Sequence, residues 1–453
     1  MSGFSVAGQH VVVVGAARSG IAAAHLLAGR GARVSLTDLR TAIDGAAGLE
    51  AAGVTLVLGS HPADLFRAAD LIVVSPGVPA GHEAFAAARA RGVRVIGEVE
   101  LASRWLRGRL IAITGTKGKS TTTALTGRIL EAAGAHVLVG GNIGSPLSGH
   151  VAASTPETIH VVEVSSFQLE TADTFHPWIA ALLNLSADHL DRHANLEEYA
   201  GAKARIFARQ TADDWAVVNA DDPQTLAIAA RGRARQRRFA LHAPAGADIT
   251  VAGGVVVERS PSGEIALMKT SDVQLIGPHL LADVLAASAI ARLAGAGPAH
   301  IAAAVSSFRG LEHAMERVAD IGGVRYVNDS KATNVDAARQ AIDTFESDLV
   351  VVMGGRYKGG DFGSLRSSLA ARHATVVAIG EAAPRIHEAL GPAMRVIDAA
   401  SMGEAVRAAR AAAGGKGTVL LAPACSSFDM FTDYAARGRA FKDEVARLAG
   451  GQD

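Results

Sequence analysis

The stretch AITGTKGKSTTT, residues 112–123, contains the residue types of a loop that holds nucleotide phosphates. Glycines let backbone N–H groups converge on an anion, and a helix beginning at Lys119 or Ser120 would point its positive end at the same place. Lys119 adds a full charge, and Ser120 or Thr121 supplies a hydroxyl that can bind magnesium. Because its first glycine is Gly115, the loop is a shortened variant of the common spacing. We therefore predict a phosphate site at the end of a strand.

An acid follows in a segment that otherwise has the pattern of a buried strand. Glu163 stands near the end of the apolar run HVVEVSS. A buried charge is costly unless it is paired or bound to a metal, so this carboxylate is predicted to bind magnesium. His189 lies in the loop after the next predicted strand, and Lys203 lies on a helix predicted to begin near Leu196. Alone, His189 fits a structural histidine and Lys203 a solvated helix residue better than a site, and their place beyond a strand end leaves that interpretation and a role at the phosphate site equally open.

The C-terminal third contains three polar loops, each after a predicted strand: YVNDSKATN at 326–334, GGRYKGGDF at 354–362 and PACSSFDMF at 423–431. Open α/β sheets bind ligands at the carboxyl edge of their strands, where three such loops would meet. Two lysines, Lys331 and Lys358, and several hydroxyls suit a small dianion such as an acidic amino acid. Each loop alone also fits an ordinary turn, but the coincidence of three favours a binding site.

The N-terminal run VVVVGAARSG resembles the glycine turn of a dinucleotide site, with Gly15 and Gly20 in the outer positions. Asp38 closes the next predicted strand, where an acid can bind a ribose hydroxyl. Ala17 stands where a dehydrogenase has a glycine, so a nicotinamide cofactor is disfavoured. From these residues, a nucleotide site and a plain strand-to-helix turn both stay open. The loop SPGVP at 75–79 fits backbone donors for a diphosphate and a proline-stiffened turn, and the residues alone do not favour the diphosphate.

The elements that must position these residues follow from the alternation of short Val- and Ile-rich runs with Ala- and Leu-rich segments of helical period. This alternation predicts an α/β protein whose parallel sheets are covered by helices. The length of 453 residues suggests about three domains, and polar breaks place them at 1–105, 106–309 and 310–453. We expect the outer two to be Rossmann-like and the central one to be P-loop ATPase-like. Residues 240–276 predict a small antiparallel sheet appended to the central domain, beside its parallel sheet.

Composition argues against several classes of partner. Lysine plus arginine equals aspartate plus glutamate at 44 each, which predicts no basic surface for nucleic acid or an anionic membrane. The single cysteine, Cys425, excludes an internal disulfide and is typical of a reducing compartment. The N-terminus has no basic stretch followed by a signal core, and no apolar run reaches the roughly 18 residues of a membrane span. We expect a cytoplasmic monomer that binds neither nucleic acid nor membrane.

Seven motifs occur in the order in which they occur in Mur ligases, and this resemblance covers nearly the whole chain. The motifs are TGTKGKST (114–121), GGNIG (140–144), EVSSFQLE (163–170), NLSADHLDRH (184–193) with Lys203, NDSKATN (328–334), GGRYKGGDF (354–362) and PACSSFDMF (423–431). The last three resemble the branch of the family that adds D-glutamate to UDP-N-acetylmuramoyl-L-alanine. The phosphate loop is shared with folylpolyglutamate synthases, whereas the C-terminal motifs are more specific.

The resemblance implies that the N-terminal domain binds the UDP-sugar, the central domain ATP and two magnesium ions, and the C-terminal domain D-glutamate. Catalytic roles are implied for Lys119, Asn142, His189 and Lys203, of which Lys203 is implied to be carbamylated. Magnesium ligands are implied at Ser120, Glu163, His189 and Lys203. ATP contacts are implied at Gly115, Thr116, Lys117, Gly118, Lys119, Ser120, Thr121, Asp329 and Lys331. Substrate contacts are implied at Arg18, Ser19, Asp38, Arg40, Gly77, Asn142, Ser165, Thr333, Lys358, Ser427 and Tyr434.

The implied reaction is an amide ligation through an acyl phosphate in peptidoglycan precursor synthesis. At three positions that bear on nucleotide affinity the chain differs from the family pattern, with Leu280 and Asp283 in place of asparagines and Ala314 in place of an arginine. A ligase for L-glutamate or another amino acid, or a folylpolyglutamate synthase, is the alternative within the same class. A non-catalytic NTP-binding switch protein is the alternative from a different class.

Overall fold

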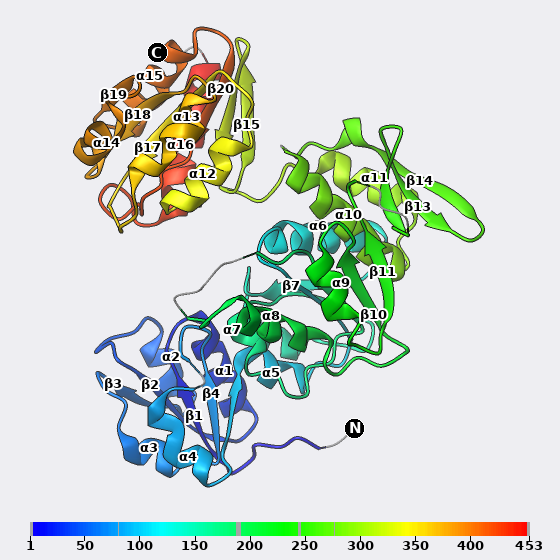
Figure 1. Ribbon diagram of the computed structural model, residues 1–453. Coiled ribbons are helices and arrows are strands. Elements are labelled where there is room, and N and C mark those ends of the chain that lie inside the picture. The colour runs from blue at the N-terminus through cyan, green and yellow to red at the C-terminus, as the bar shows by residue number, and fades with distance from the viewer. Residues whose placement is uncertain (1–2, 80, 187–191, 243–245, 276, 451–453) are drawn as a thin grey trace. The chain divides into compact units, whose positions relative to one another are not determined.

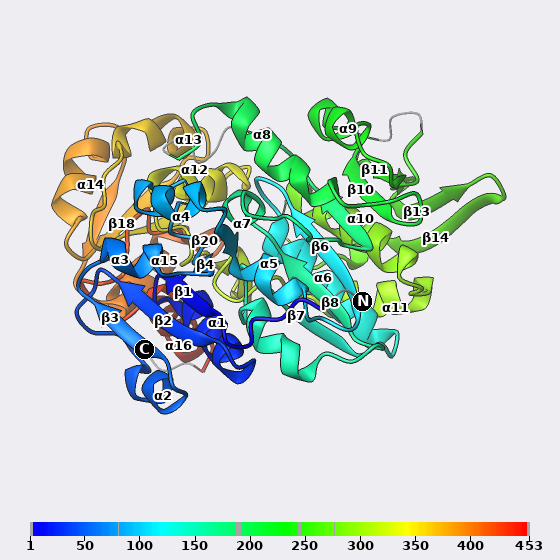
Figure 2. The ribbon, with the colours of Figure 1, turned by 90° about the horizontal axis from the view of Figure 1, so that it is seen from below.

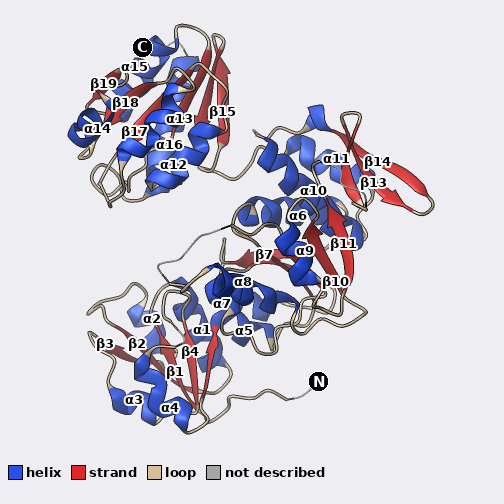
Figure 3. Ribbon diagram, viewed as in Figure 1, coloured by secondary structure: helices blue, strands red, loops and turns tan. Residues whose placement is uncertain are grey.

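The computed structural model describes residues 3–79, 81–186, 192–242, 246–275 and 277–450. By its contacts the chain divides into two compact units, one of residues 1–273 and 281–306 and the other of residues 274–280 and 307–453. Figure 1 follows the chain from blue at its N-terminus to red at its C-terminus, and Figure 3 shows each sheet flanked by helices. Two of the three sheets lie in the first unit and one lies in the second.

The N-terminal sheet has five parallel strands in the order β3-β2-β1-β4-β5. The strands are β1 (His10–Val14), β2 (Arg33–Asp38), β3 (Thr55–Leu58), β4 (Leu71–Val74) and β5 (Arg94–Gly97). The helices are α1 (Arg18–Gly29), α2 (Ala46–Ala51), α3 (Ala63–Arg67), η1 (Glu83–Phe85), α4 (Ala86–Ala90) and α5 (Glu98–Ser103). In β1, Val11 and Val13 join one core cluster, and Val12 and Val14 join another. Burial of both faces is typical of a central parallel strand.

The turn between β1 and α1 has the close backbone approach that its glycines predict. Gly15 has a φ of +92°, in the left-handed region. A Cβ added at Gly20 would lie 1.8 Å from the Gly15 carbonyl oxygen, so a larger residue cannot occupy that position without a shift. The strand order reverses between β1 and β4, and such a switch point is where open α/β sheets bind ligands.

The central sheet has nine strands in the order β14-β13-β12-β11-β10-β9-β6-β8-β7. The strands are β6 (Arg109–Thr114), β7 (Val137–Gly141), β8 (Ile159–Glu163), β9 (Ile179–Leu182), β10 (Trp215–Asn219), β11 (Arg235–Phe239), β12 (Ile249–Ala252), β13 (Val255–Ser260) and β14 (Gly263–Lys269). The helices are α6 (Lys119–Ala132), η2 (Leu147–Ala153), α7 (Ser166–Leu169), α8 (Leu196–Ala204), η3 (Arg205–Phe207), α9 (Pro223–Ala229), η4 (Thr270–Asp272), α10 (Pro278–Leu293) and α11 (Pro298–Ser307).

The predicted antiparallel strands are present, but they extend the central sheet rather than form a sheet of their own. β12 joins β11 in parallel through a single pair, Phe239 with Ile249. β13 then pairs antiparallel with both β12 and β14. In Figures 1 and 2 the β13–β14 hairpin projects from this edge of the sheet. The β runs that sequence patterning identified are therefore correct, and only their attachment differs.

The sheet of the second unit has six strands in the order β15-β16-β20-β17-β18-β19, and all neighbours are parallel except β15 and β16. The strands are β15 (Glu316–Ile321), β16 (Val324–Asn328), β17 (Leu349–Gly354), β18 (Thr375–Ile379), β19 (Val396–Ala399) and β20 (Gly417–Leu421). The helices are α12 (Val335–Asp343), η5 (Phe362–Leu365), α13 (Arg366–Ala370), α14 (Ala383–Leu390), α15 (Met402–Ala413) and α16 (Tyr434–Ala449). Separate apolar clusters cover the two faces.

The predicted fold class is confirmed, since the chain forms one parallel sheet and two mixed, mainly parallel sheets, each flanked by helices. The domain limits 1–105, 106–309 and 310–453 stay a prediction. Among the helices of the described residues, none is long and apolar enough to cross a membrane.

Candidate active site

The phosphate loop has the local structure that its glycines predict. β6 ends at Thr114, and α6 begins at Lys119, directly after Gly118. Gly118 has a φ of +78°, and a Cβ added there would lie 2.0 Å from Asp283 Oδ1. Glycine therefore suits the left-handed backbone at this position, and a larger residue would also require the Asp283 side chain to move. The first N–H groups of a helix have no partner within the helix and are of the kind that bind anions, and at the start of α6 Ser120 and Thr121 are half-buried.

The Asn184 side chain holds the backbone of the phosphate loop through hydrogen bonds. No role was predicted for this residue from the sequence. Its Oδ1 accepts hydrogen bonds from the backbone N–H groups of Thr116 at 3.1 Å and Lys117 at 2.9 Å, and its Nδ2 donates to the Lys117 carbonyl at 3.1 Å. Lys119 Nζ donates to the Thr116 carbonyl at 2.9 Å, so this side chain folds back over the loop. Asn184 stands two residues after β9, and this place beyond a strand end was the signal that could have identified it.

Glu163 and Asn142 lie next to each other at the carboxyl edge of the central sheet. Glu163 ends β8, where it pairs with Ile113 of β6 and Gly141 of β7. Asn142 Nδ2 donates to Glu163 Oε1 at 2.8 Å, whereas the buried Glu163 Oε2 has no hydrogen-bond partner among the described residues. A buried carboxylate oxygen left in this way fits a bound cation.

Of the predicted magnesium ligands His189 and Lys203, the structure describes only Lys203. In the described part of the chain no three His, Cys, Asp or Glu side chains gather as a metal site, and His189 lies outside that part. Lys203 is buried near the end of α8, the helix predicted from Leu196. Its Nζ donates to the Gly115 carbonyl at 2.8 Å and lies 4.5 Å from the centre of the Tyr199 ring. Lys203 therefore contacts the phosphate loop at Gly115, while its role as a magnesium ligand stays a prediction.

Asp283 is buried against the phosphate loop from α10. Burial raises the pKa of its carboxyl to about 8, although the Thr122 hydroxyl and the Lys119 charge lower it. The carboxyl is therefore protonated at neutral pH. A neutral group beside the loop does not repel a phosphate, whereas an ionised one would. Leu280, the other altered position on this helix, is buried and apolar.

The predicted sugar-nucleotide contacts gather where β1, β2 and β4 end. Asp38 ends β2, and its carboxylate accepts from the Ala16 N–H at 2.7 Å and pairs with Arg40 at 2.9 Å, which lowers its pKa. Arg18 donates to the carbonyl of Gly144 at 2.5 Å. Ser19 lies half-buried in the first turn of α1.

Two further predicted substrate contacts have contrasting surroundings. Gly77 is exposed in the loop after β4. Ser165 forms a capping box at the start of α7, where its hydroxyl accepts from the Gln168 N–H at 3.3 Å. This hydroxyl therefore has a structural partner in the fold.

In the second unit, the three predicted loops follow the adjacent strands β16, β20 and β17, as the sequence analysis expected. The loops after β17 and β20 are joined by reciprocal backbone hydrogen bonds between Arg356 and Ser426, at 2.9 and 3.1 Å. The Ala424 N–H donates to the Ala332 carbonyl at 3.0 Å, which joins the loops after β20 and β16. One sheet edge therefore presents all three loops together.

The side chains expected at this edge have different degrees of exposure. Lys358 is exposed, Thr333 is half-buried, Ser427 is buried, and Tyr434 is 42% exposed at the start of α16. The two residues predicted to contact ATP from this unit, Asp329 and Lys331, also differ in exposure, since Lys331 is exposed and Asp329 is buried. Burial raises the pKa of the Asp329 carboxyl to about 7, although the hydrogen bond from the Met315 N–H and the charge of Lys331 lower it.

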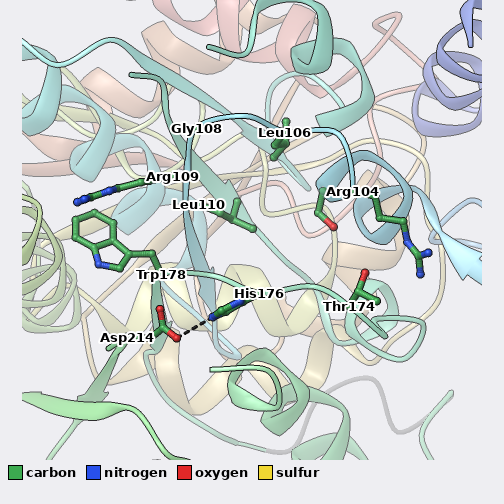
Figure 4. A pocket seen from close by; sticks show the side chains of 10 residues that line it. Arg104, Leu106, Gly108, Arg109, Leu110, Thr174, His176, Trp178 and Asp214 are labelled. Carbon is green, nitrogen blue, oxygen red and sulfur yellow. Dashed lines mark hydrogen bonds and ion pairs between the residues drawn. The ribbon is translucent and has the colours of Figure 1, made fainter. Parts of the chain in front are cut away.

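A cavity of about 300 Å³ lies at the opposite end of the central strands and contains none of these residues (Figure 4). Arg109 begins β6, Trp178 precedes β9 and Asp214 precedes β10, and the Arg109 guanidinium lies 4.4 Å from the centre of the Trp178 ring. His176 and Asp214 form an ion pair at 2.7 Å, which Figure 4 marks. This cavity is therefore not part of the phosphate site.

Comparison with known proteins gives concordant matches along the chain. Family models match over residues 9–97 (Mur ligase MurD-like, N-terminal domain), 113–291 (Mur ligase middle domain) and 313–425 (Mur ligase, glutamate ligase domain). The UDP-N-acetylmuramoylalanine–D-glutamate ligase of Acidobacterium capsulatum is 45% identical, over 98% of this chain and 97% of the relative. The enzyme of the same name from Solibacter usitatus is also 45% identical, over 97% and 98%. The fold is shared with a MurF ligase from Thermotoga maritima solved in complex with ADP, at a TM-score of 0.58 and 16% identity over 98% of this chain and 96% of that one.

Proposed function

This chain belongs to the Mur ligase family, and on that premise we propose that it joins D-glutamate to UDP-N-acetylmuramoyl-L-alanine, with conversion of ATP to ADP and phosphate. The relatives that carry this ligase name match nearly the full length of the chain at 45% identity. An ATP-dependent ligase also accounts for the presence of a phosphate loop and a separate polar site on another sheet.

The observation that carries the proposal is the group of side chains around the phosphate loop. Asn142 and Glu163 are hydrogen-bonded to each other at 2.8 Å, and Lys203 donates to the loop at Gly115. A switch protein needs a loop that holds phosphate. It does not need the side chains of Glu163, Asn142 and Lys203 beside that loop, nor a buried carboxylate oxygen of Glu163 that has no hydrogen-bond partner among the described residues.

In the proposed reaction the alanyl carboxylate attacks the γ-phosphorus of ATP, and the bond to the β–γ bridging oxygen breaks to release ADP. The amine of D-glutamate then attacks the acyl carbon, loses a proton and displaces phosphate. Phosphoryl transfer depends mainly on positioning and charge neutralisation. Lys119 and the first turn of α6 would hold the phosphates, and Asn142 would orient the acceptor.

Magnesium would be held by Ser120, Glu163, Lys203 as a carbamate and His189, and would supply charge neutralisation between the phosphates and the acceptor. The carbamate forms when the deprotonated amine adds to carbon dioxide and a proton is released, which converts a cation into an oxygen ligand. The leftover oxygen of Glu163 supports this assignment. Residues Thr333, Lys358, Ser427 and Tyr434 would bind the two carboxylates and the body of D-glutamate.

Phosphate release from ATP tests the proposal. Purified protein with magnesium and UDP-N-acetylmuramoyl-L-alanine should release phosphate on addition of D-glutamate, with one amide formed per phosphate. The Lys119→Ala variant should lose this activity, because it removes the lysine ammonium that would neutralise the charge of the phosphates. The matched control is Lys269→Ala, at the exposed end of β14, which should behave as wild type. Release with L-glutamate or a folate substrate, but not with D-glutamate, would transfer the assignment to the corresponding ligase. No release with any acceptor would refute it.

A further inference from the structure

Arg437 in the first turn of α16 is a buried arginine that the sequence analysis did not identify. Its side chain is 1% exposed, and the ion pairs of the described residues do not include it. Its Nε and Nη2 donate to the hydroxyl and the carbonyl of Ser330, each at 2.9 Å. Its Nη1 donates to the carbonyls of Cys425 at 3.1 Å and Gly354 at 3.5 Å. One guanidinium thus contacts three separate segments of the sheet edge.

These three segments are the bases of the three loops that carry the predicted amino-acid contacts. Ser330 follows β16 and stands three residues before Thr333. Gly354 ends β17, four residues before Lys358.

The remaining contacts follow the same pattern. Cys425 follows β20 and stands two residues before Ser427. The fourth predicted contact, Tyr434, begins the helix that carries Arg437, and its carbonyl accepts from the Ser330 hydroxyl at 2.7 Å. Every side chain assigned to the glutamate site is therefore on a segment that Arg437 contacts or belongs to.

Stability alone is a poor reason to bury this side chain. Removing a guanidinium from water is unfavourable when no carboxylate pairs with it directly, and apolar residues of similar volume often replace buried charges without loss. Burial lowers the pKa of Arg437 to about 10, so the group still carries its charge at neutral pH. What arginine offers here is a rigid planar fork of donors that can bind several carbonyl groups in fixed directions.

The loops also approach too closely to tolerate an independent shift. A Cβ added at Gly355 would lie 2.2 Å from the Ser426 carbonyl oxygen and 3.1 Å from Arg437 Nη1. Backbone hydrogen bonds join these loops in pairs, whereas Arg437 contacts all three at once. A displacement at the guanidinium is therefore expected to reach Thr333, Lys358 and Ser427 together.

We propose that Arg437 is a positioning residue of the amino-acid site, which fixes the three loops at the spacing that the two carboxylates of glutamate require. The proposal rests on the proposed function, because it presupposes that this edge binds the amino acid. It predicts that Arg437 affects KM for D-glutamate more than it affects KM for the other two substrates. A side chain that contributed only to folding would change the amount of active enzyme and leave every KM unaltered.

The test compares steady-state kinetics of wild type, Arg437→Met, Arg437→Lys and Ser330→Ala with each of the three substrates varied in turn. Arg437→Met should raise KM for D-glutamate about ten- to hundredfold, the range expected when contacts move by about 1 Å. KM for ATP and for the UDP-sugar should stay within about twofold of wild type. Arg437→Lys keeps the charge but not the fork, so its KM should be intermediate. The matched control Arg447→Met, an exposed arginine on the same helix, should leave all three values unchanged.

The outcomes separate the two proposals. A wild-type enzyme that does not use D-glutamate refutes the proposed function. An active wild type whose Arg437→Met variant has an unaltered KM for D-glutamate, or loses only kcat, refutes the positioning role. If Arg437→Met fails to fold, the KM values for D-glutamate of Ser330→Ala and Arg437→Lys test the positioning role instead. Because Ser330→Ala removes one partner of the guanidinium and little volume, unaltered KM values in both variants would also refute the role.

Discussion

Replacement of Asp283 by asparagine should stabilise the first unit, and the gain should grow as the pH rises. The Asp283 carboxyl lies buried beside Gly118, and burial raises its pKa to about 8 from an ordinary value of 3.8. In the unfolded chain the same group ionises near pH 4. Between these values the native state holds a proton that the unfolded state has released.

The sign and size of the effect follow from this difference in bound protons. Where the native state binds one more proton than the unfolded state, the free energy of unfolding falls by about 1.4 kcal/mol per pH unit. The stabilising contribution is fully present below pH 4 and is lost as the pH rises towards 8. Asparagine has the same shape and does not ionise, so it escapes this loss. The stability of Asp283→Asn relative to wild type should therefore increase by about 2.7 kcal/mol from pH 5 to pH 7.

Urea unfolding followed by tryptophan emission measures this difference. All three tryptophans, Trp105, Trp178 and Trp215, lie in the first unit, so their emission reports its unfolding. The exposed Asp213→Asn is the control, and its stability relative to wild type should not change between pH 5 and 7. A relative stability of Asp283→Asn that is constant or falls over this range would show that the buried carboxyl is not held protonated.

Two more predictions concern single substitutions in the first unit, at Lys203 and at Gly20. Lys203→Ala should lose most phosphate release and amide formation, since it removes the proposed ligand beside Gly115; wild-type turnover by this variant would exclude the carbamate role. Gly20→Ala should lower the melting temperature of the first unit by several degrees, because its Cβ would lie 1.8 Å from a carbonyl oxygen. Gly29→Ala on the same helix has open space around it and should be neutral or slightly stabilising, and equal melting temperatures for the two variants would contradict the steric argument.

The residues predicted from the sequence are those whose roles are set within a few positions of the chain. The glycines of the phosphate loop, the apolar run before Glu163 and the helix carrying Lys203 are local patterns, and each has the structure that its pattern predicts. The strand RQRRF at Arg235–Phe239 has no apolar pattern and was not predicted. It exists because it pairs with β10 and because Arg237 forms an ion pair with Glu258 of β13.

Contacts between distant segments could not be predicted in this way. Asn184 is 67 residues from the Lys117 backbone that it binds, and Arg437 is 107 residues from Ser330. Asp283 was recognised as an unusual residue for its position, but only the packing of α10 against Gly118 shows that its carboxyl is dehydrated. The site thus consists of locally encoded loops and of supports that only the tertiary structure reveals.

The hydrogen bonds from Asn184 to the phosphate loop affect the free energy with which the loop would bind phosphates. Since its amide fixes the backbone of Thr116 and Lys117, this part of the phosphate loop is ordered as the chain folds. The loss of conformational entropy then belongs to folding, and little of it is subtracted from the free energy of binding. The phosphate affinity of this loop is accordingly linked to the Asn184 side chain, which acts through its bonds to the backbone.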